Sequence, residues 1–485
     1  MRRIGLSLLL FLLGCLLFSS QGLAGSPPKK EENRLQAAIR RISNTPCLRQ
    51  GKVGVKVVSL SRQETLVAIN ADQHFIPASN TKLFTTAVAL LRLHPEYTFA
   101  TPLFTDGKLV GDRLEGNLYL QGSGDPSLVS EELWIMVEQL WNQGIRAIKG
   151  DIVGDDRFFT GAERGRGWTN PRSVRAYNAK TGALSLNFNA IAVRVEPGRR
   201  KGEKVRVTLS PPTAYITLTS RATTSPAGSR TAITVDRRPL PQGDRIVVAG
   251  RMAAGEGPQT FYRNISHPTL FTLTVLREFL ERYGIAVQGG VREGEVPPEA
   301  TRLLTHHSKP LARILLDMNK FSNNFIAEQV LKTLGAEIKG PPGSFQKGLD
   351  VLEETLAELG IAPRTYTLAD GSGLSPLNRV TPAQIVHLLE QMYNRFTVQA
   401  EFLASLGIMG VDGSVKERLE QTPAQRRVRV KTGSLAGVSA LSGYVETLQG
   451  ELLAFSILMN RFACGLFQAM DLQDEMVLQM VRFAR

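Results

Sequence analysis

Ser79 and Lys82 lie three residues apart at the start of an apolar segment, residues 77–91. Pro77 and the apolar residues at helical spacing predict a helix that begins near Ser79, and residues three apart share one face of a helix. A serine hydroxyl becomes a nucleophile when a base takes its proton, and a neutral lysine can be that base. Burial and the positive end of a helix both lower a lysine pKa. The two residues therefore meet the local requirements of a Ser–Lys catalytic pair.

The S-x-x-K spacing occurs twice more, at Ser26 with Lys29 and at Ser344 with Lys347. The ordinary interpretation of such a match is a capped surface helix. Ser26 lies in a proline-containing segment, and Ser344 follows a Gly-Pro-Pro-Gly loop. Only Ser79 begins a long apolar helix, so we take it as the candidate nucleophile.

A second polar cluster lies far along the chain. Ser322 and Asn324 form an S-x-N motif between two predicted helices, residues 311–318 and 325–334. The ordinary interpretation of these two residues is a helix cap. Beside a catalytic serine they could instead carry protons and bind a peptide amide.

A third cluster follows an alternating strand at residues 427–431, where Lys431 precedes Thr432, Gly433 and Ser434. A glycine in a strand lets another backbone approach closely. The ordinary interpretation of Lys431 is an edge-strand charge. However, S-x-x-K, an S-x-N of the S-D-N type and K-T-G, in this order, are the motifs of β-lactamases and penicillin-binding proteins.

Second copies of two motifs occur close together, a K-T-G at residues 180–182 and an S-x-N at residues 185–187. They stand in the wrong order, because K-T-G should follow S-x-N. The first copy also lacks an alternating strand before it. We therefore do not expect them to be catalytic.

The three motifs make the chain resemble the class C low-molecular-mass penicillin-binding proteins, which are D-alanyl-D-alanine carboxypeptidases with endopeptidase activity. From Ser79 to Ser322 there are 243 residues, and in this family that interval holds two extra domains. Further stretches are similar to the family at residues 122–126, 183–187, 307–311, 318–324, 370–375 and 410–414.

The resemblance implies how the first residues act. Lys82 would deprotonate Ser79, which would attack the carbonyl between two D-alanines. Ser322 and Lys431 would relay the proton to the leaving D-alanine, and Asn324 would hold the peptide amide.

The same resemblance implies the remaining contacts of the substrate. Lys431 and Thr432 of the Lys431-Thr432-Gly433-Ser434 segment would attract its C-terminal carboxylate. The backbone N–H groups of Ser79 and Ser434 would hold the oxyanion. Water would free the acyl-enzyme, whereas a penicillin would acylate Ser79 and leave slowly.

One position departs from the family pattern. After residues 370–375 the family usually has an arginine that helps bind the free end of the substrate side chain, but here that position is Pro376. Asp155 resembles the other family residue at that end, although it could equally be an ordinary strand-end carboxylate. Recognition of a diaminopimelate end therefore stays open.

Both ends of the chain contribute to one predicted sheet, with strands at residues 52–60 and 65–69 and again at 427–431, 438–447 and 452–459. We therefore expect an α/β (α+β) domain that is penicillin-binding transpeptidase-like or β-lactamase-like, with a large insertion. The insertion would hold an α/β domain and a small β-rich domain. The expected boundaries are a signal peptide at 1–24, the peptidase domain at 33–102 and 306–485, the inserted α/β domain at 103–190 and 262–305, and the β-rich domain at 191–261.

Within the insertion we expect a βαβ unit with a strand at residues 118–120, a helix at 131–142 and a strand at 147–153 that leads to Asp155. Short strand-like runs separated by Gly and Pro follow from residue 191. Later we expect a single helix at residues 382–396.

The chain carries a formal net charge of +14, and its first 24 residues have the pattern of a secretory signal peptide. Removal of that segment would leave +12, because it contains Arg2 and Arg3 and no acid. For a periplasmic or other extracytoplasmic protein, this charge favours peripheral association with an anionic envelope polymer or membrane surface. The basic residues are dispersed and no nucleic-acid-binding motif is present, so we expect no nucleic-acid partner.

Cys47 and Cys464 would remain after cleavage. In an oxidising compartment they could form a disulfide between the two ends of the chain, and two free buried cysteines are the alternative. No cofactor and no metal site are expected. The expected ligands are peptidoglycan stem peptides and β-lactam antibiotics.

Two other functions remain open at this point. A β-lactamase would need an efficient deacylating base between the second and third motifs, where Glu353, Glu354 and Glu358 look helical. A non-catalytic scaffold that binds peptidoglycan would need no complete set of motifs.

Overall fold

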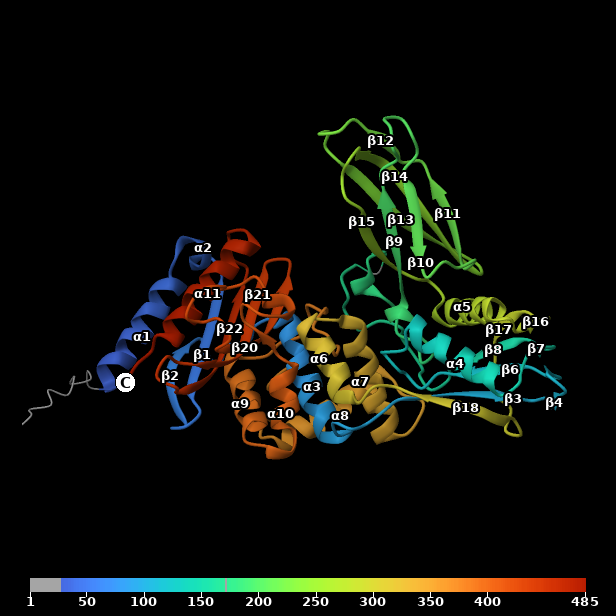
Figure 1. Ribbon diagram of the computed structural model, residues 1–485. Helices are drawn as coiled ribbons and strands as arrows, with labels where there is room; N and C mark the ends of the chain where they lie inside the picture. Colours follow the sequence, from blue (N-terminus) through green and yellow to red (C-terminus); the bar gives the residue numbers. More distant parts are fainter. Residues whose placement is uncertain (1–27, 171) are drawn as a thin grey trace, which may run out of the picture.

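The computed structural model describes residues 28–170 and 172–485, and Figure 1 shows its elements. The predicted signal peptide lies outside the described residues. A six-stranded antiparallel sheet, in the order β19-β20-β21-β22-β1-β2, joins the two ends of the chain. Its strands are β1 (Lys52–Ser59), β2 (Glu64–Ile69), β19 (Gly407–Ile408), β20 (Val428–Leu435), β21 (Val438–Glu446) and β22 (Leu452–Asn460).

Helices cover both faces of this sheet. Alternate side chains of β22 point in opposite directions, as in any strand. Leu453 and Phe455 pack with α1 (Pro28–Ser43) and α11 (Leu466–Val481), whereas Ala454 packs toward the other face. A disulfide between Cys47, in α2 (Pro46–Arg49), and Cys464 joins the two ends of the chain.

A bundle of helices lies on the other face of the sheet and contains the first two motifs. The helix predicted at residues 382–396 ends at Tyr393, and a further helix begins at Phe396, because the chain leaves helical geometry at Arg395. Ser344 caps a helix by accepting a hydrogen bond from the Lys347 backbone N–H at 3.2 Å, which is the ordinary role of an S-x-x-K serine. The helices are α3 (Thr81–Arg92), α6 (Leu311–Lys320), α7 (Asn324–Lys339), α8 (Phe345–Glu358), α9 (Pro382–Tyr393) and α10 (Phe396–Ser405).

The segment between α3 and α6 departs from this body and returns to it along paired strands. β3 (Ala100–Thr105) pairs antiparallel with β18 (Thr301–His307), so the chain leaves and returns side by side. A five-stranded sheet, β17-β8-β6-β3-β18, and a four-stranded sheet, β16-β7-β5-β4, pack with α4 (Ser130–Asn142) and α5 (Pro268–Tyr283). The remaining strands are β4 (Leu109–Val110), β5 (Arg113–Leu114), β6 (Leu118–Gln121), β7 (Ala147–Ile148), β8 (Ile152–Asp155), β16 (Ala286–Val287) and β17 (Val291–Glu293).

The βαβ unit is present, but its second strand differs from the prediction. β6 pairs in parallel with β8 after α4. The single strand predicted at residues 147–153 is divided into β7 and β8, which belong to different sheets. Lys149, Gly150 and Asp151 separate them, and a side chain on Gly150 would collide with the Gly116 carbonyl.

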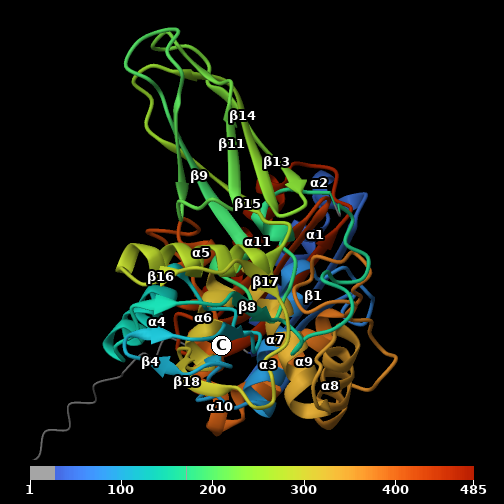
Figure 2. The same ribbon diagram turned by 90° about the vertical axis from the view of Figure 1, so that its right-hand side faces the viewer.

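A β-rich lobe stands off from the rest of the molecule in Figures 1 and 2. It contains a three-stranded sheet, β10-β9-β15, and a four-stranded sheet in which β14 pairs with β11, β12 and β13. The architecture confirms the expected fold class, while the exact domain boundaries stay a prediction. The strands are β9 (Ala190–Glu196), β10 (Arg206–Ser210), β11 (Ile216–Ser220), β12 (Thr223–Ser225), β13 (Ala232–Leu240), β14 (Gly243–Ala253) and β15 (Gln259–Asn264).

Within the described residues, no helix combines the length and the apolar character that crossing a membrane requires.

Candidate active site

Ser79 lies in a 3-10 turn (Ala78–Asn80) that leads directly into α3. The Asn80 side chain fixes this turn on the sheet, since it donates to the Lys431 carbonyl at 2.9 Å and accepts from Ser442 Oγ at 2.6 Å. A Cβ atom on Gly433 would lie 2.8 Å from the Pro77 carbonyl and 3.0 Å from the Ser79 nitrogen. Glycine therefore lets β20 approach the turn that contains Ser79 closely.

Lys82, in the first turn of α3, is fully buried and points to the serine. Its Nζ lies 3.0 Å from Ser79 Oγ, 2.7 Å from Asn324 Oδ1 and 2.7 Å from the Ser372 carbonyl. Burial lowers the Lys82 pKa from 10.5 to about 7, although the carboxylates of Glu328 and Asp370 act in the opposite direction. A substantial fraction of neutral amine is therefore present near neutral pH, within reach of the Ser79 proton.

Lys431 is also fully buried and approaches the site from β20. Its Nζ lies 2.9 Å from Ser322 Oγ and 2.8 Å from the Thr432 carbonyl. Burial, and then the positive charge of Lys82, hold the pKa of Lys431 well below 10.5. The two lysines thus each contact one serine hydroxyl.

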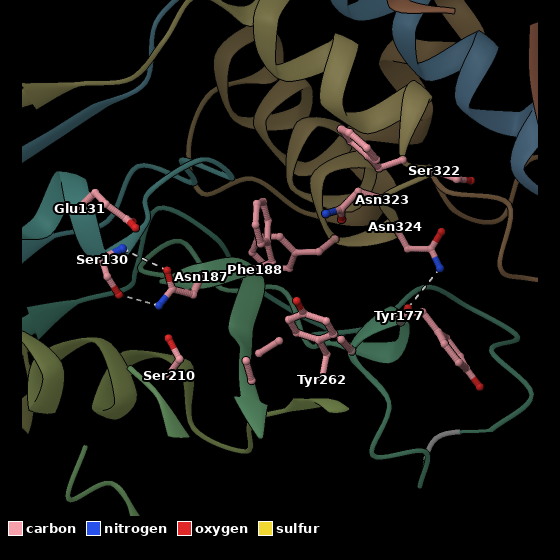
Figure 3. Close-up of a pocket in the computed structure, with 15 residues that line it drawn as sticks. Ser130, Glu131, Tyr177, Asn187, Phe188, Ser210, Tyr262, Ser322, Asn323 and Asn324 are labelled. Carbon is pink, nitrogen blue, oxygen red and sulfur yellow. Dashed lines mark hydrogen bonds between the residues drawn. The ribbon is translucent and has the colours of Figure 1, made fainter. Parts of the chain in front are cut away.

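The turn between α6 and α7 presents the S-x-N residues. Ser322 has φ of 56°, a left-handed conformation that costs a non-glycine residue energy and often marks functional sites. Asn323 caps α7, because its side chain accepts from the Ile326 N–H at 3.1 Å. Asn324 contacts Lys82 through Oδ1 and donates through Nδ2 to the Tyr177 carbonyl at 3.1 Å, so the insertion also touches the site (Figure 3).

Glu328 and the loop at residues 370–375 support the site, and their role was not predicted from the sequence. Glu328, one turn after Asn324 on α7, is fully buried and accepts from the N–H groups of Gly371 and Ser372, both at 2.9 Å. Burial and the charge of Asp370 raise its pKa above the usual range. The helical spacing from Asn324 is the signal in the sequence that could have drawn attention to it.

A cleft of about 430 Å³ opens over the serine. Ser79, Ser322, Asn324 and Ser434 form its polar side, while Trp168 belongs to the insertion. The hydroxyl of Thr432, beside Lys431 on β20, is 2.7 Å from the hydroxyl of Ser414.

Asp155 does not join the other predicted site residues. Its buried carboxylate accepts hydrogen bonds from the Arg157 side chain at 3.0 and 2.8 Å and from the Val296 N–H at 3.1 Å. It is absent from the lining of the cleft. Its proposed contact with substrate therefore stays an untested prediction.

The second copies of the motifs lie apart from this arrangement. Lys180 forms an ion pair with Glu163, and Asn187 hydrogen-bonds to Ser130. Within residues 28–170 and 172–485, no group of three or more His, Cys, Asp or Glu side chains is arranged to hold a metal ion.

Fold and site together define a serine enzyme of the penicillin-binding class. The model of the D-Ala-D-Ala carboxypeptidase 3 (S13) family matches residues 35–483, and the chain belongs to that family. It is therefore a serine-type hydrolase, a D-Ala-D-Ala carboxypeptidase, as the resemblance predicted.

Individual relatives agree with this assignment. The chain is 36% identical to a D-alanyl-D-alanine carboxypeptidase of Actinomadura sp. (strain R39) over 442 residues, which cover 88% of this chain and 81% of the relative. It is also similar to the crystal structure of penicillin-binding protein 4 (dacB) from Haemophilus influenzae, with a TM-score of 0.79, 26% identity and coverage of 91% and 98% of the two chains. A second structure of that protein, complexed with a β-lactam, gives a TM-score of 0.75 at 26% identity, with coverage of 92% and 99%.

Proposed function

We propose that this carboxypeptidase cleaves the D-Ala-D-Ala bond of peptidoglycan stem peptides through an acyl-enzyme on Ser79. Lys82 takes the hydroxyl proton while Oγ attacks the carbonyl carbon of the penultimate D-alanine. The N–H groups of Ser79 and Ser434 hold the oxyanion that forms. The 3.0 Å contact between a buried, pKa-lowered Lys82 and Ser79 carries this proposal.

The peptide bond then breaks and the terminal D-alanine leaves as an amine. Over this step the proton of Ser79 passes by way of Lys82, Ser322 and Lys431 to the leaving nitrogen. Thr432, beside Gly433, binds the departing carboxylate, and Asn324 holds the peptide amide. Water then attacks the ester, neutral Lys82 takes its proton, and Ser79 is regenerated.

Inhibition by penicillin is part of the same proposal, supported by the β-lactam complex of the Haemophilus influenzae relative. Among the described residues that line the cleft there is no Asp or Glu that could activate water for fast release of a penicilloyl group. Glu354 and Glu358 of α8 instead form ion pairs with Lys339 and Arg92. These contacts favour a penicillin-sensitive peptidase over a β-lactamase.

Endopeptidase activity on cross-linked peptides is the second reaction that we propose for this site. A second hollow continues from the cleft past Ser322 and Asn324, which line both. That continuity lets a substrate that stays attached to the polymer leave the cleft, as a cross-linked peptide does.

Export by the segment at residues 1–24 and peripheral attachment to an anionic envelope surface complete the proposal. The region 191–261 contains twelve Lys and Arg against five Asp and Glu, a net charge of +7, which is half of the chain's +14. Several of these cations are exposed on the lobe and form no ion pair with any described residue: Arg199, Arg200, Lys201, Lys204, Arg221, Arg230 and Arg251.

The test is labelling with a fluorescent penicillin, using the parent protein, Ser79→Ala and Ser344→Ala. We expect stable labelling of the parent and of Ser344→Ala, which retains the catalytic serine, and none of Ser79→Ala. The parent and Ser344→Ala should also release D-alanine from a pentapeptide, and Ser79→Ala should not. Fast labelling followed by fast release of the label would support a β-lactamase. No labelling of the folded parent would exclude the catalytic function and leave a non-catalytic scaffold as the remaining interpretation.

A further inference from the structure

A second hollow, of about 500 Å³, lies beside the catalytic cleft (Figure 3). The S-x-N turn and the start of α7 form one wall, and the segment Asn187–Asn189 and β15 form the other. Tyr177, Ser322 and Asn324 line both this hollow and the catalytic cleft. A polymer held at Ser79 could therefore extend into it without crossing a barrier.

Exposed aromatic side chains gather around this hollow. Tyr177 is 46% exposed, Phe188 37%, Tyr262 60% and Phe321 71%. They come from four separate segments, including β15 of the β-rich lobe and the residue just before Ser322. Large apolar side chains that cluster at the surface usually mark a binding site.

The backbone holds Phe188 in its position at an energetic cost. Asn187, Phe188 and Asn189 have φ of 51°, 58° and 51°, a left-handed conformation that is least favourable for the aromatic Phe188. Asn187 bonds to the N–H and hydroxyl of Ser130 at 3.0 and 2.8 Å, and Asn189 bonds to Ser185 Oγ at 2.9 Å. Two anchored asparagines thus present one aromatic ring to the hollow.

Phe188 also packs against the helix that begins with Asn324. Its ring lies 6.3 Å from that of Phe325, with the planes at 82°. This edge-to-face contact joins the strained segment to the catalytic turn.

The polar groups of the hollow are neutral with one exception. Its lining contains amides and hydroxyls, among them Asn187, Asn323 and Ser210, and a single carboxylate, Glu131. In the part of the chain that the structure describes, no Lys, Arg or His lines it. An acidic stem peptide would leave its carboxylates without a cation, whereas a neutral sugar would meet aromatic faces with its C–H groups and amides with its hydroxyls.

We infer that this hollow binds a neutral N-acetylated hexosamine of the glycan strand whose stem peptide occupies the catalytic cleft. The inference rests on the proposed function, because it assigns one part of the same polymer to each of two connected cavities. Binding of the sugar would hold the peptide near Ser79 by raising its effective concentration.

Binding to Ser79→Ala protein separates this inference from the proposed reaction. We would titrate that protein calorimetrically with a stem pentapeptide and with the same peptide attached to its N-acetylated disaccharide. The disaccharide-peptide should bind at least 10-fold more tightly. Equal affinities, including no measurable binding of either ligand, would overturn the inference.

Tyr262→Ala, made in the Ser79→Ala protein, locates the sugar in the hollow. Tyr262 lies on an exposed face of β15 and has no part in the proposed chemistry. Its replacement should weaken binding of the disaccharide-peptide about 5- to 10-fold and leave the free peptide unchanged. Phe467→Ala, at an 80% exposed aromatic on α11, is the matched control and should change neither affinity.

The two hypotheses fail in different ways. The sugar site would be excluded if Tyr262→Ala lowered the affinity for both ligands equally, or if Phe467→Ala had the same effect as Tyr262→Ala. This would hold even in a protein that penicillin labels. If the parent protein took no penicillin and released no D-alanine, the proposed function would fail, and the difference between the two titrations would still decide the sugar site.

Discussion

The carboxylate of Glu328 accepts a hydrogen bond from the backbone N–H of Ser372 at 2.9 Å. The carbonyl of the same Ser372 accepts from Lys82 Nζ at 2.7 Å. A buried acid thus sets the position of a carbonyl that in turn fixes the proposed base. Because that carboxylate also acts on the Lys82 charge, Glu328 is a positioning residue with an electrostatic effect.

Glu328→Gln should slow acylation about 10-fold, or about 1.4 kcal/mol in activation free energy. The amide keeps the shape of the side chain but replaces one of its two acceptor oxygens with a donor that faces a backbone N–H. Burial raises the pKa of Glu328 to about 8, so its side chain is mostly protonated below pH 7. The variant should therefore leave the acidic limb of the rate profile, which follows Lys82, at the same pH. Stopped-flow rates with a chromogenic β-lactam across pH 5–9 measure both effects.

The control for this substitution is Glu337→Gln, which lies on the exposed side of the same helix and accepts a hydrogen bond from Tyr97. It should retain the parent rate and the parent pH profile. A Glu328→Gln profile displaced to lower pH would contradict the prediction, because it would mean that Glu328 is ionised over the acidic limb and raises the Lys82 pKa.

Acylation of the parent should rise with pH through about 7. The Lys82 pKa is lowered to about 7, and only the neutral amine accepts the Ser79 proton, so the rate should fall about 10-fold for each pH unit well below that value. The same chromogenic assay gives the profile, and Lys82→Arg, which stays charged, should be inactive at every pH. A flat profile between pH 5 and 8 would exclude Lys82 as the base.

The same pKa predicts how stability depends on pH. A lysine whose folded pKa lies below its unfolded value binds more protons in the unfolded state, so stability rises as pH increases from about 7 to about 10. Lys82→Met removes this contribution, and its thermal midpoint relative to the parent should therefore decline across that window. Lys52→Met, at an exposed lysine of β1, should show a constant difference from the parent.

The motifs that meet in the candidate site could be predicted because their positions depend on short, fixed spacings. One helical turn fixes the spacing of Ser79 and Lys82. Close approach of the backbone requires a glycine at position 433. Glu328 and Ser372 were missed because their contact joins residues 44 apart in sequence through a loop with no regular period. Backbone strain at Ser322 is equally invisible without coordinates.

The errors in the fold have a related cause. Periodicity favoured one strand across residues 147–153, but β7 and β8 belong to different sheets, and Gly150 between them lies against the backbone of Gly116. The pattern of hydrophobic residues predicts which side chains are buried, but it does not predict which strand lies beside them. Composition likewise left two states open for Cys47 and Cys464, which the structure joins.

Loss of that disulfide should destabilise the peptidase body. Cys47 and Cys464 are 417 residues apart, and closing so long a loop restricts the unfolded chain strongly. Replacing both with alanine should lower the free energy of unfolding by about 2–4 kcal/mol, measured by urea denaturation. Adding a reductant should lower the stability of the parent and leave the double variant unchanged; equal sensitivity of both would contradict the prediction.

The exposed cations of the β-rich lobe should determine attachment to anionic surfaces. Each Lys or Arg near such a surface contributes about 1 kcal/mol, so replacing Arg199, Arg200 and Lys201 with glutamine should weaken binding by roughly 100-fold. Co-sedimentation with vesicles that contain phosphatidylglycerol, at low and at 0.5 M salt, measures the effect, and the high salt should abolish binding of the parent.

The matched control neutralises three exposed cations outside the lobe, Arg40 and Arg41 of α1 and Lys52 of β1, which form no ion pair with any described residue. This variant has the same net charge as the lobe variant. If attachment depended only on total charge, the two variants would bind equally weakly, and the lobe would have no special role. We expect the control to keep most of its affinity, because the lobe concentrates +7 within 71 residues at one projecting part of the fold.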